Sequence, residues 1–420
     1  MSQSHHILII GTVWPEPDSS AAGSRMIQLI NLFQKSGWRV TFVSSSAKSE
    51  HSEDLEKLDI RCMAVEMNSS SFDDFIREEN PDAVMFDRFM VEEQFGWRVA
   101  ENCPGALRIL DTEDLHCLRN ARRNAVEEGR SFTEKDLFVD NMAKREIASI
   151  YRCDLSLIIS VFEYDLLRYH FGIDESLLCH LPFLLEPVEE SHKNCLPAFD
   201  ERSGFITIGN FLHEPNRDAV FQLKEQMWPM ITKKLPDARL HVYGAYPSQQ
   251  IFDLHNEKEG FLVHGRADNA FDVVSRARVL LAPLRFGAGL KGKLIESMMC
   301  GTPSVTTAIG AEGINGYLPW PGAVSENPEI FAASAVELYR DKYTWQRANE
   351  YGFNILELRF LRERHEKRFM DKINQLISRL DEHRKLNFTG AMLMHHTMAG
   401  TRYMSKWIEE KNKIASLPNE

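Results

Sequence analysis

Short apolar runs alternate with helix-like patterns along most of the chain. Residues 7–10 are consecutive apolar residues, which predict a buried strand, and Met26, Leu29 and Phe33 then recur at the spacing of one helix face. Further apolar runs lie at residues 39–43, 83–86, 107–110 and 155–159. Strands that alternate with helices in this way predict a doubly wound parallel sheet.

The alternation stops after residue 186. Residues 187–203 contain two prolines, several acidic residues and no periodicity, so they predict a linker. Beyond it, apolar runs return at residues 205–208, 239–243, 261–263, 279–281 and 304–306. We therefore predict an α/β fold with two Rossmann-like, doubly wound domains, residues 1–186 and 204–385, that face each other across a cleft. Ligands of such sheets bind beyond the carboxyl ends of the strands.

The last part of the chain is amphipathic. Residues 355–380 have apolar side chains at three- and four-residue spacing, which predicts one long helix. The tail, residues 386–420, holds further apolar residues, among them Phe388, Tyr403 and Trp407. Left in water these would form a patch that soluble monomers rarely expose, so we expect the tail to cross back onto the first domain. An interface between copies of the chain is the alternative, and the sequence does not indicate the oligomeric state.

Composition excludes several classes of function. The formal net charge of −12 argues against general binding to the nucleic-acid backbone. None of the seven cysteines forms a Cys-x-x-Cys pair, which predicts reduced thiols and no cysteine metal site. The N-terminal apolar run is too short for a signal peptide, and no stretch approaches the ~20 apolar residues of a membrane span. We therefore expect a cytoplasmic protein, with association at a membrane surface left open.

The most informative segment is residues 283–303. A strand ends at Pro283, a glycine-rich loop follows, and a helix that contains Lys293 and Glu296 starts near Lys291. Two lysines at a helix N-terminus oppose the helix dipole unless an anion is bound there. Free backbone amides at such an end also favour a phosphate. The segment therefore predicts a phosphate site, and an exposed lysine–glutamate pair on a surface helix is the alternative.

This segment resembles the donor-binding stretch of the family-4 glycosyltransferases, the group 1 transferases. Their pattern is a glycine-rich loop, basic residues, a glutamate and Gly-x-Pro. The resemblance implies the GT-B fold of two Rossmann-like domains, with Lys291 and Lys293 on the diphosphate of a nucleotide sugar and Glu296 on its ribose. Many members have a second glutamate where this chain has Ala288, and we expect backbone amides to replace it. The donor-binding candidates of the loop are Gly287, Ala288, Gly289 and Leu290.

The start of the second domain resembles the same family. Gly209 and Asn210 follow the strand at residues 205–208 and would pass close to the diphosphate. Arg217 is a further donor-binding candidate in place of the family's usual basic residues. Helix capping by Asn216 is the rival interpretation of this stretch. Residues 308–313 resemble the loop that faces the donor at the last strand.

In the first domain, residues 22–25 resemble the family's glycine-bearing first loop, which faces the acceptor. Gly23 and Arg25 are therefore acceptor-side candidates. Residues 110–116 follow a buried strand and resemble an Asp-x-x-Asp-Leu stretch with a histidine in several members. The catalytic candidates there are Asp111, Asp114 and His116, and the acceptor-side candidates at the end of another strand are Asp87 and Arg88. Helix capping is the alternative for such acids.

Residues 160–163 also match a family pattern, but local structure explains them without chemistry. Serine followed by glutamate after three residues is a capping box. We therefore predict that Ser160 and Glu163 cap a helix.

Taken together, these segments predict a glycosyltransferase that moves a sugar from a UDP- or GDP-sugar to a hydroxyl group. The acceptor is a glycan, a lipid-linked molecule, a protein or a small molecule, and the resemblance implies retention of configuration. No Asp-x-Asp motif occurs, so we expect no metal and no cofactor besides the donor substrate. The alternatives are a nucleotide-sugar epimerase or a phosphorylase on the same fold, or a noncatalytic sugar-nucleotide-binding protein.

Overall fold

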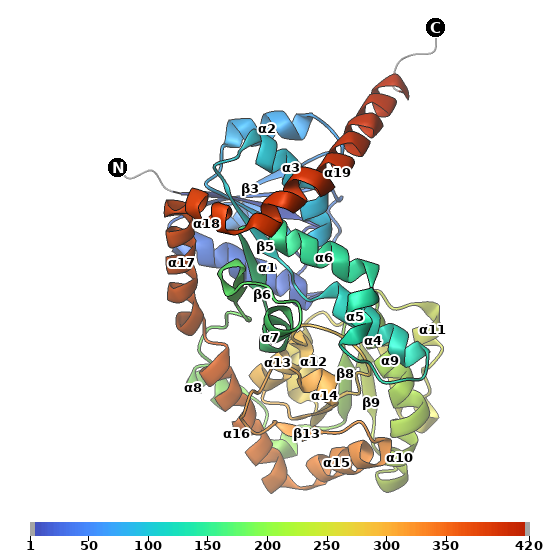
Figure 1. The fold of residues 1–420 in the computed structure, drawn as a ribbon. Helices are drawn as coiled ribbons and strands as arrows, with labels where there is room; N and C mark the ends of the chain where they lie inside the picture. Colours follow the sequence, from blue (N-terminus) through green and yellow to red (C-terminus); the bar gives the residue numbers. More distant parts are fainter. Residues whose placement is uncertain (1–4, 416–420) are drawn as a thin grey trace.

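The computed structural model describes residues 5–415, except for the side chains of residues 396–399 and 415. Within this range the chain forms two α/β domains, the first above the second in Figure 1. The first sheet has the strand order β3-β2-β1-β4-β5-β6-β7, and the second has the order β10-β9-β8-β11-β12-β13. All pairings between these strands are parallel. The predicted fold class is therefore confirmed.

The first sheet consists of β1 (His6–Gly11), β2 (Arg39–Ser44), β3 (Arg61–Ala64), β4 (Ala83–Asp87), β5 (Leu107–Asp111), β6 (Leu155–Ile158) and β7 (Leu178–His180). The helices between these strands and just after them are α1 (Ala21–Lys35), α2 (Ser71–Glu79), α3 (Phe89–Asn102), α4 (His116–Glu127), α5 (Lys135–Val139), α6 (Asn141–Arg152), α7 (Val161–Tyr169) and α8 (Glu190–Cys195).

The second sheet consists of β8 (Phe205–Ile208), β9 (Leu240–Tyr243), β10 (Phe261–Gly265), β11 (Val279–Ala282), β12 (Ser304–Thr306) and β13 (Gly322–Val324). The helices of the rest of the chain are α9 (Glu214–Gln222), α10 (Trp228–Lys234), α11 (Gln249–Phe252), α12 (Ala270–Arg276), α13 (Gly292–Met299), α14 (Ala308–Ala311), α15 (Pro328–Arg340), α16 (Lys342–Arg359), α17 (Arg362–Ser378), α18 (Leu380–Leu386) and α19 (Phe388–Ala415).

Strand β1 shows how the sequence builds the first domain. Side chains alternate across a strand, so Leu8 and Ile10 pack into the core on one face of the sheet and Ile7 and Ile9 into the core on the other. All four are fully buried, as expected of a parallel strand that is covered on both faces. The strand order reverses between β1 and β4, and a binding crevice is expected beyond the carboxyl ends of the strands at such a point.

The predicted linker, residues 187–203, contains the short helix α8, which the sequence analysis missed. None of the residues of α8 is buried. It therefore has no apolar periodicity from which a helix is predicted.

The chain returns to the first domain earlier than the sequence predicts. Helix α16 ends at Arg359 and α17 begins at Arg362, so residues 355–380 are parts of two helices and not one. Between the helices Leu361 is extended and pairs in parallel with Leu185, which lies just before the predicted linker. The two crossings between the domains are thus hydrogen-bonded to each other, with Leu185 N donating to the Phe360 carbonyl at 2.8 Å.

Helix α17 belongs to the core of the first domain. Its Phe369 packs edge-on against Phe33 of α1, with 5.8 Å between the ring centroids, and Ile373 is buried in the same cluster. The predicted end of the second domain at residue 385 is therefore too late, because α17 already packs on the first domain. The apolar spacing continues through the break at Leu361, which hides the boundary in the sequence.

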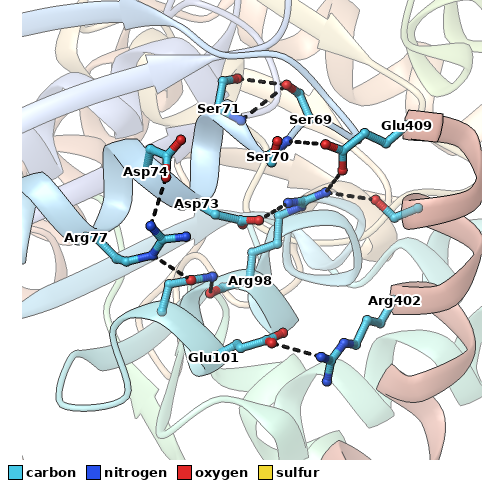
Figure 2. A network of polar contacts seen from close by, with 12 residues as sticks. Ser69, Ser70, Ser71, Asp73, Asp74, Arg77, Arg98, Glu101, Arg402 and Glu409 are labelled. Atoms are coloured by element: carbon cyan, nitrogen blue, oxygen red, sulfur yellow. Dashed lines mark hydrogen bonds and ion pairs between the residues drawn. The ribbon is translucent and has the colours of Figure 1, made fainter. Parts of the chain in front are cut away.

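Helices α18 and α19 follow α17, and α19 contacts α3 and α6 of the first domain. Figure 2 shows the central contact, Arg98 of α3, whose side chain is 1% exposed. Its guanidinium donates to Asp73 Oδ2 at 2.6 Å and to Ser405 Oγ of α19 at 3.2 Å. It also lies 3.8 Å from Glu409 Oε2, and Glu409 accepts a hydrogen bond from Ser70 N at 3.2 Å.

The tail is therefore held by polar contacts and not by its aromatic residues. Tyr403 and Trp407 are 70% and 60% exposed, whereas we expected these side chains to be covered. Residues 416–420 of the predicted tail lie outside the described residues. No helix within residues 5–415 is long and apolar enough to cross a membrane.

The Arg98 contacts predict how the tail contributes to stability. Arg98→Ala leaves the carboxylates of Asp73 and Glu409, 14% and 12% exposed, without their shared cation, so we expect a loss of about 3–5 kcal/mol in the free energy of unfolding. Arg402→Ala is the matched control, because its ion pair with Glu101 is 41% and 40% exposed and contributes about 0–1 kcal/mol. Urea unfolding measures both, and equal losses would contradict the role of Arg98.

Candidate active site

A cavity of about 880 Å³ lies between the two domains. The segments that line it follow the carboxyl ends of β1, β4 and β5 in the first domain and of β8, β9, β10 and β11 in the second. Both sheets thus direct their ligand-binding edges into one cleft, as the sequence predicts.

The second-domain side is centred on the start of α13. Lys291 is the N-cap of this helix, and its Nζ donates to the Gly289 carbonyl at 2.8 Å. Lys293 Nζ donates to Asn216 Oδ1 at 2.7 Å. Burial lowers the pKa of Lys291 and the pKa of Lys293, each to about 8, and burial also raises the pKa of Glu296. All three predicted residues line the cleft, where an anion would restore the charged form of both lysines.

The glycine-rich loop before α13 is shaped by the first domain. Gly289 has a φ of +62°, and a Cβ there would lie 2.8 Å from the Cβ of Asp114. The Gly287 carbonyl accepts a hydrogen bond from Arg122 at 2.9 Å. Ala288 is buried in the hydrophobic core of the first domain, so the position where many relatives have a glutamate packs against the other domain. Leu290 is buried and also lines the cleft.

The start of the second domain supports Lys293 from the other side. A Cβ on Gly209 would lie 2.8 Å from Lys293 Nζ, so the missing side chain leaves room for the ammonium group. Asn216 accepts from Lys293 and donates to the Asn210 carbonyl at 2.8 Å. It is not a helix cap, because His213 is the N-cap of α9. Gly209 and Asn210 line the cleft.

Arg217 is not brought into the site. It is absent from the lining of the cleft and lies 3.7 Å from Glu214 on the surface of α9. Its neighbour Asn216 lines the cleft instead and contacts Lys293 and Asn210. The prediction for Arg217 is corrected accordingly.

On the first-domain side, Asp114 and His116 line the cleft as predicted. Burial alone would raise the pKa of Asp114, but the nearby Arg119 and His116 lower it to about 2. Burial lowers the pKa of His116 to about 4, so the imidazole is neutral near pH 7. His116 Nε2 lies 3.4 Å from Asp114 Oδ1. The pair therefore presents one ionised carboxylate and one neutral imidazole.

Arg25 and Asp111 do not line the cleft, and both predictions need correction. They form an ion pair at 3.0 Å in which the side chains are 1% and 0% exposed. Arg25 also donates to the Leu181 carbonyl at 2.8 Å. The ion pair thus holds the Asp111 side chain in the interior of the first domain, away from the cleft. The pair joins α1, β5 and the end of the first domain beneath the site.

The remaining acceptor-side candidates line the cleft. Gly23 lies at the start of α1, where a Cβ would be 2.4 Å from the Glu16 carbonyl oxygen, so only glycine permits this approach. Asp87 accepts from Thr12 N at 2.9 Å, and Arg88 Nε lies 3.7 Å from Asp87 Oδ1.

Side chains of the first domain hold the two domains together around the cleft. Arg122 of α4 donates to both carboxylate oxygens of Glu312, at 2.8 and 2.7 Å, besides its bond to the donor loop. Arg123 donates to Glu214 at 2.6 Å. The sequence analysis missed these arginines. A cluster of three arginines, at positions 119, 122 and 123, on the helix after the acidic strand end was the available signal.

Glu163 is a further residue whose role was misread. The predicted capping box does not form, because the cap of α7, Ser160, accepts no side-chain hydrogen bond in the described structure. Instead Glu163 Oε1 accepts from Leu115 N at 2.9 Å and from Gly289 N at 2.8 Å. These amides lie 48 and 126 residues away in sequence, so no local pattern reveals them. Glu163 joins the acidic segment of one domain to the donor loop of the other.

No group of three or more His, Cys, Asp or Glu side chains among the described residues is arranged to hold a metal ion. The cationic side chains that line the cleft are Arg88, Arg119, Arg266, Lys291 and Lys293.

Glu163 gives a pH-dependent prediction. Burial, reinforced by the charge of Asp114, raises its pKa from the ordinary value of 4.5 to about 8. Between these two values the unfolded chain loses a proton that the folded protein keeps, so this group lowers stability as the pH rises. Glu163→Gln cannot ionise, and we expect its stability relative to the wild type to increase from pH 5 to pH 8.

Urea unfolding at the two pH values measures this difference. Glu134→Gln, at an exposed position, is the matched control and should show little change with pH relative to the wild type. A Glu163→Gln difference that is the same at both pH values would contradict the prediction.

Comparison with known proteins agrees with this geometry. Residues 202–341 match the family described as glycosyl transferases group 1. This segment spans the second domain from β8 to α15 and includes the glycine-rich loop and α13. No curated protein shows a significant match to the sequence.

The whole chain is similar in fold to solved glycosyltransferases. Sucrose-phosphate synthase from Thermosynechococcus elongatus is 15% identical, with a TM-score of 0.64 over 89% of this chain and 99% of that chain. A glycosyltransferase from Rickettsia africae is 10% identical, with a TM-score of 0.64 over 89% and 99%. Anabaena HepE, solved in complex with UDP, is 11% identical, with a TM-score of 0.63 over 89% and 100%. The chain therefore has the GT-B fold, and residues 202–341, which span most of its second domain, match the group 1 glycosyl transferases.

Proposed function

We propose that this protein transfers a glycosyl group from a UDP- or GDP-sugar to an acceptor hydroxyl, with retention of configuration and without a metal ion. The observation that carries the proposal is the pair of lysines at the start of α13, the buried Lys291 and the half-buried Lys293, in a cleft between two domains. Two cations with lowered pKa values, next to free helix amides, match the charge of a diphosphate.

Each donor-side residue has a role in this proposal. Lys291 and Lys293 bind the diphosphate, and the carboxyl group of Glu296, one turn further along α13, binds the ribose. The glycine-rich loop offers backbone amides to the phosphate or the sugar. Structures of Anabaena HepE contain UDP, UDP with glucose, and UDP-glucose, which supports a uridine nucleotide as the first donor to test.

The proposed chemistry needs no separate base. The bond between the anomeric carbon and the diphosphate oxygen breaks, and a bond from the acceptor oxygen to the same carbon forms on the same face. The acceptor proton passes to an oxygen of the leaving diphosphate. Lysine ammonium groups and amides that are already in place stabilise the developing negative charge.

The acceptor binds, in this proposal, on the side formed by the first domain. Asp87, Arg88, Asp114 and His116 line that wall. A glycan, a lipid-linked molecule, a protein or a small molecule are all compatible with a hydroxyl acceptor. We place the enzyme in the cytoplasm, and family 4 is the proposed subdivision.

A thermal-shift screen with UDP, GDP, ADP and their sugars tests the proposal, because a ligand that binds only the native state raises its stability. Release of free nucleotide that depends on an acceptor then distinguishes a transferase from an epimerase or a binding protein. A protein that no nucleotide stabilises would contradict the proposed function.

The donor site predicts the effect of one substitution. Lys293→Ala removes a charged contact to the diphosphate that is strongest in the transition state, which costs about 2–4 kcal/mol, a loss of roughly 30- to 1,000-fold in rate. Lys342→Ala is the control, because Lys342 is an exposed partner of Asp200 in the same domain. Nucleotide release at saturating donor measures both rates. A Lys293 variant that retains half of the wild-type rate would place the diphosphate elsewhere.

Metal dependence gives a second prediction. Because two lysines already face the diphosphate position, we expect turnover to continue in excess EDTA. The assay is nucleotide release with and without the chelator. Complete loss of turnover that Mg²⁺ or Mn²⁺ restores would show that a metal ion takes part.

A further inference from the structure

Two non-glycine residues with positive φ stand at the ends of neighbouring strands in the first domain. Arg88, directly after β4, has φ 75° and ψ 158°, and Glu113, two residues after β5, has φ 61°. Arg88 is thus in a region that is almost restricted to glycine. Asp59, Asn68 and Asn80 also have positive φ, but Asp and Asn tolerate this conformation much better than Arg or Glu. Tyr246 of the second domain also has positive φ and lines the cleft, but its hydroxyl group donates to the Glu16 carboxylate.

The surrounding backbone fixes both residues in place. Strands β4 and β5 pair in register, with Asp87 opposite Asp111. Arg88 N donates to the Asp111 carbonyl at 2.8 Å, and Thr112 Oγ1 donates to the Leu157 carbonyl at 2.9 Å. Strained residues that their neighbours hold in this way cluster at functional sites.

The side chains of Arg88 and Glu113 make few polar contacts within the described part of the protein. Both residues line the cleft, and among the described residues no hydrogen bond to the Arg88 guanidinium or the Glu113 carboxyl group occurs. The only ion pair of Arg88 in this part of the chain is the one with Asp87, at 3.7 Å. By contrast, Asp114 pairs with Arg119 and Asp111 pairs with Arg25.

The position of the two groups suits the acceptor rather than the nucleotide. They are on the wall opposite Lys291 and Lys293, and a Cβ on Gly289 of the donor loop would lie 3.5 Å from the Glu113 carbonyl oxygen. The Glu113 segment therefore adjoins the loop that faces the donor. Burial and the nearby Asp111 raise the pKa of Glu113 well above its ordinary value, which favours the protonated carboxyl group, and that form can both donate and accept a hydrogen bond.

We propose that Glu113 and Arg88 form a subsite that binds adjacent hydroxyl groups of a neutral sugar acceptor. The inference rests on the proposed glycosyl transfer. The carboxyl group binds one hydroxyl, and the guanidinium donates to the oxygen of its neighbour. Further acids of the first domain line the same wall, namely Glu16, Asp18, Asp87 and Asp114. They repel a phosphorylated or carboxylated acceptor at this position.

Glycine substitutions distinguish an acceptor-binding role of Glu113 and Arg88 from a structural role. Glu113→Gly and Arg88→Gly relieve the strain and remove the functional group, so we expect melting temperatures equal to or above that of the wild type together with a loss of acceptor binding. Asp59→Gly is the matched control, since Asp59 has φ 59° and lies on the surface outside the cleft. It should keep both stability and binding. A large fall in melting temperature for both cleft variants would show a structural role and overturn the proposal.

Binding is measured by saturation-transfer NMR with the methyl glycosides of glucose, galactose, mannose and N-acetylglucosamine, in the presence of UDP. We expect at least one glycoside to bind the wild type and the Asp59 variant, and its Kd to rise about tenfold or more in each cleft variant. Glu113→Gln, which keeps a hydrogen-bonding group, should bind more tightly than Glu113→Gly. Unchanged glycoside binding in both glycine variants, or preferential binding of glycerol 3-phosphate, would overturn the proposal.

Calorimetry with UDP, GDP and ADP keeps the two proposals distinguishable. If the wild type binds none of these nucleotides, the proposed function itself fails. If it binds a nucleotide but none of the glycosides, the neutral-sugar subsite is wrong while the donor site stands.

Discussion

The donor loop of the second domain takes its shape from the first domain, and the rest of the site depends on this constraint. Arg122 binds the carbonyl of Gly287, Glu163 binds the amide of Gly289, and Ala288 is packed in the first-domain core. The loop in turn positions Lys291 and the first turn of α13. The proposed donor site is therefore formed by both domains together.

The two walls of the cleft also differ in charge. Two lysines are held where burial disfavours their charge, which a protein tolerates when a ligand of opposite charge completes the site. On the opposite wall, carboxylates outnumber cations. The cleft thus has one side that favours a strongly anionic group and one that disfavours it, and this asymmetry orients a substrate with a charged and an uncharged end.

The sequence predicts the fold and the local structure at the start of α13 well, because both depend on local order. Strand–helix alternation predicts the two sheets, and a glycine-rich loop before a helix predicts the position of Lys291, Lys293 and Glu296. Side-chain contacts between segments that are distant in the sequence could not be predicted from local patterns. The position of Asp111 at the end of a strand predicts a cleft residue, yet its carboxylate is buried in an ion pair with Arg25 of α1. Glu163 matched a capping box, but its partners lie in two other segments. The positive φ of Glu113 is a property of the folded backbone, which its residue type does not indicate.

The paired crossings at Leu185 and Leu361 define how the molecule can open. Both connections between the domains run side by side at one edge, near α16 and α17, whereas the Arg123–Glu214 contact joins α4 to α9 on the opposite side in Figure 1. The Leu185–Leu361 bridge is thus placed as a hinge between the two domains. Rotation about that bridge would separate α4 from α9 most, so we expect the cleft to open at this edge and the ion pairs of Arg122 and Arg123 to hold it closed.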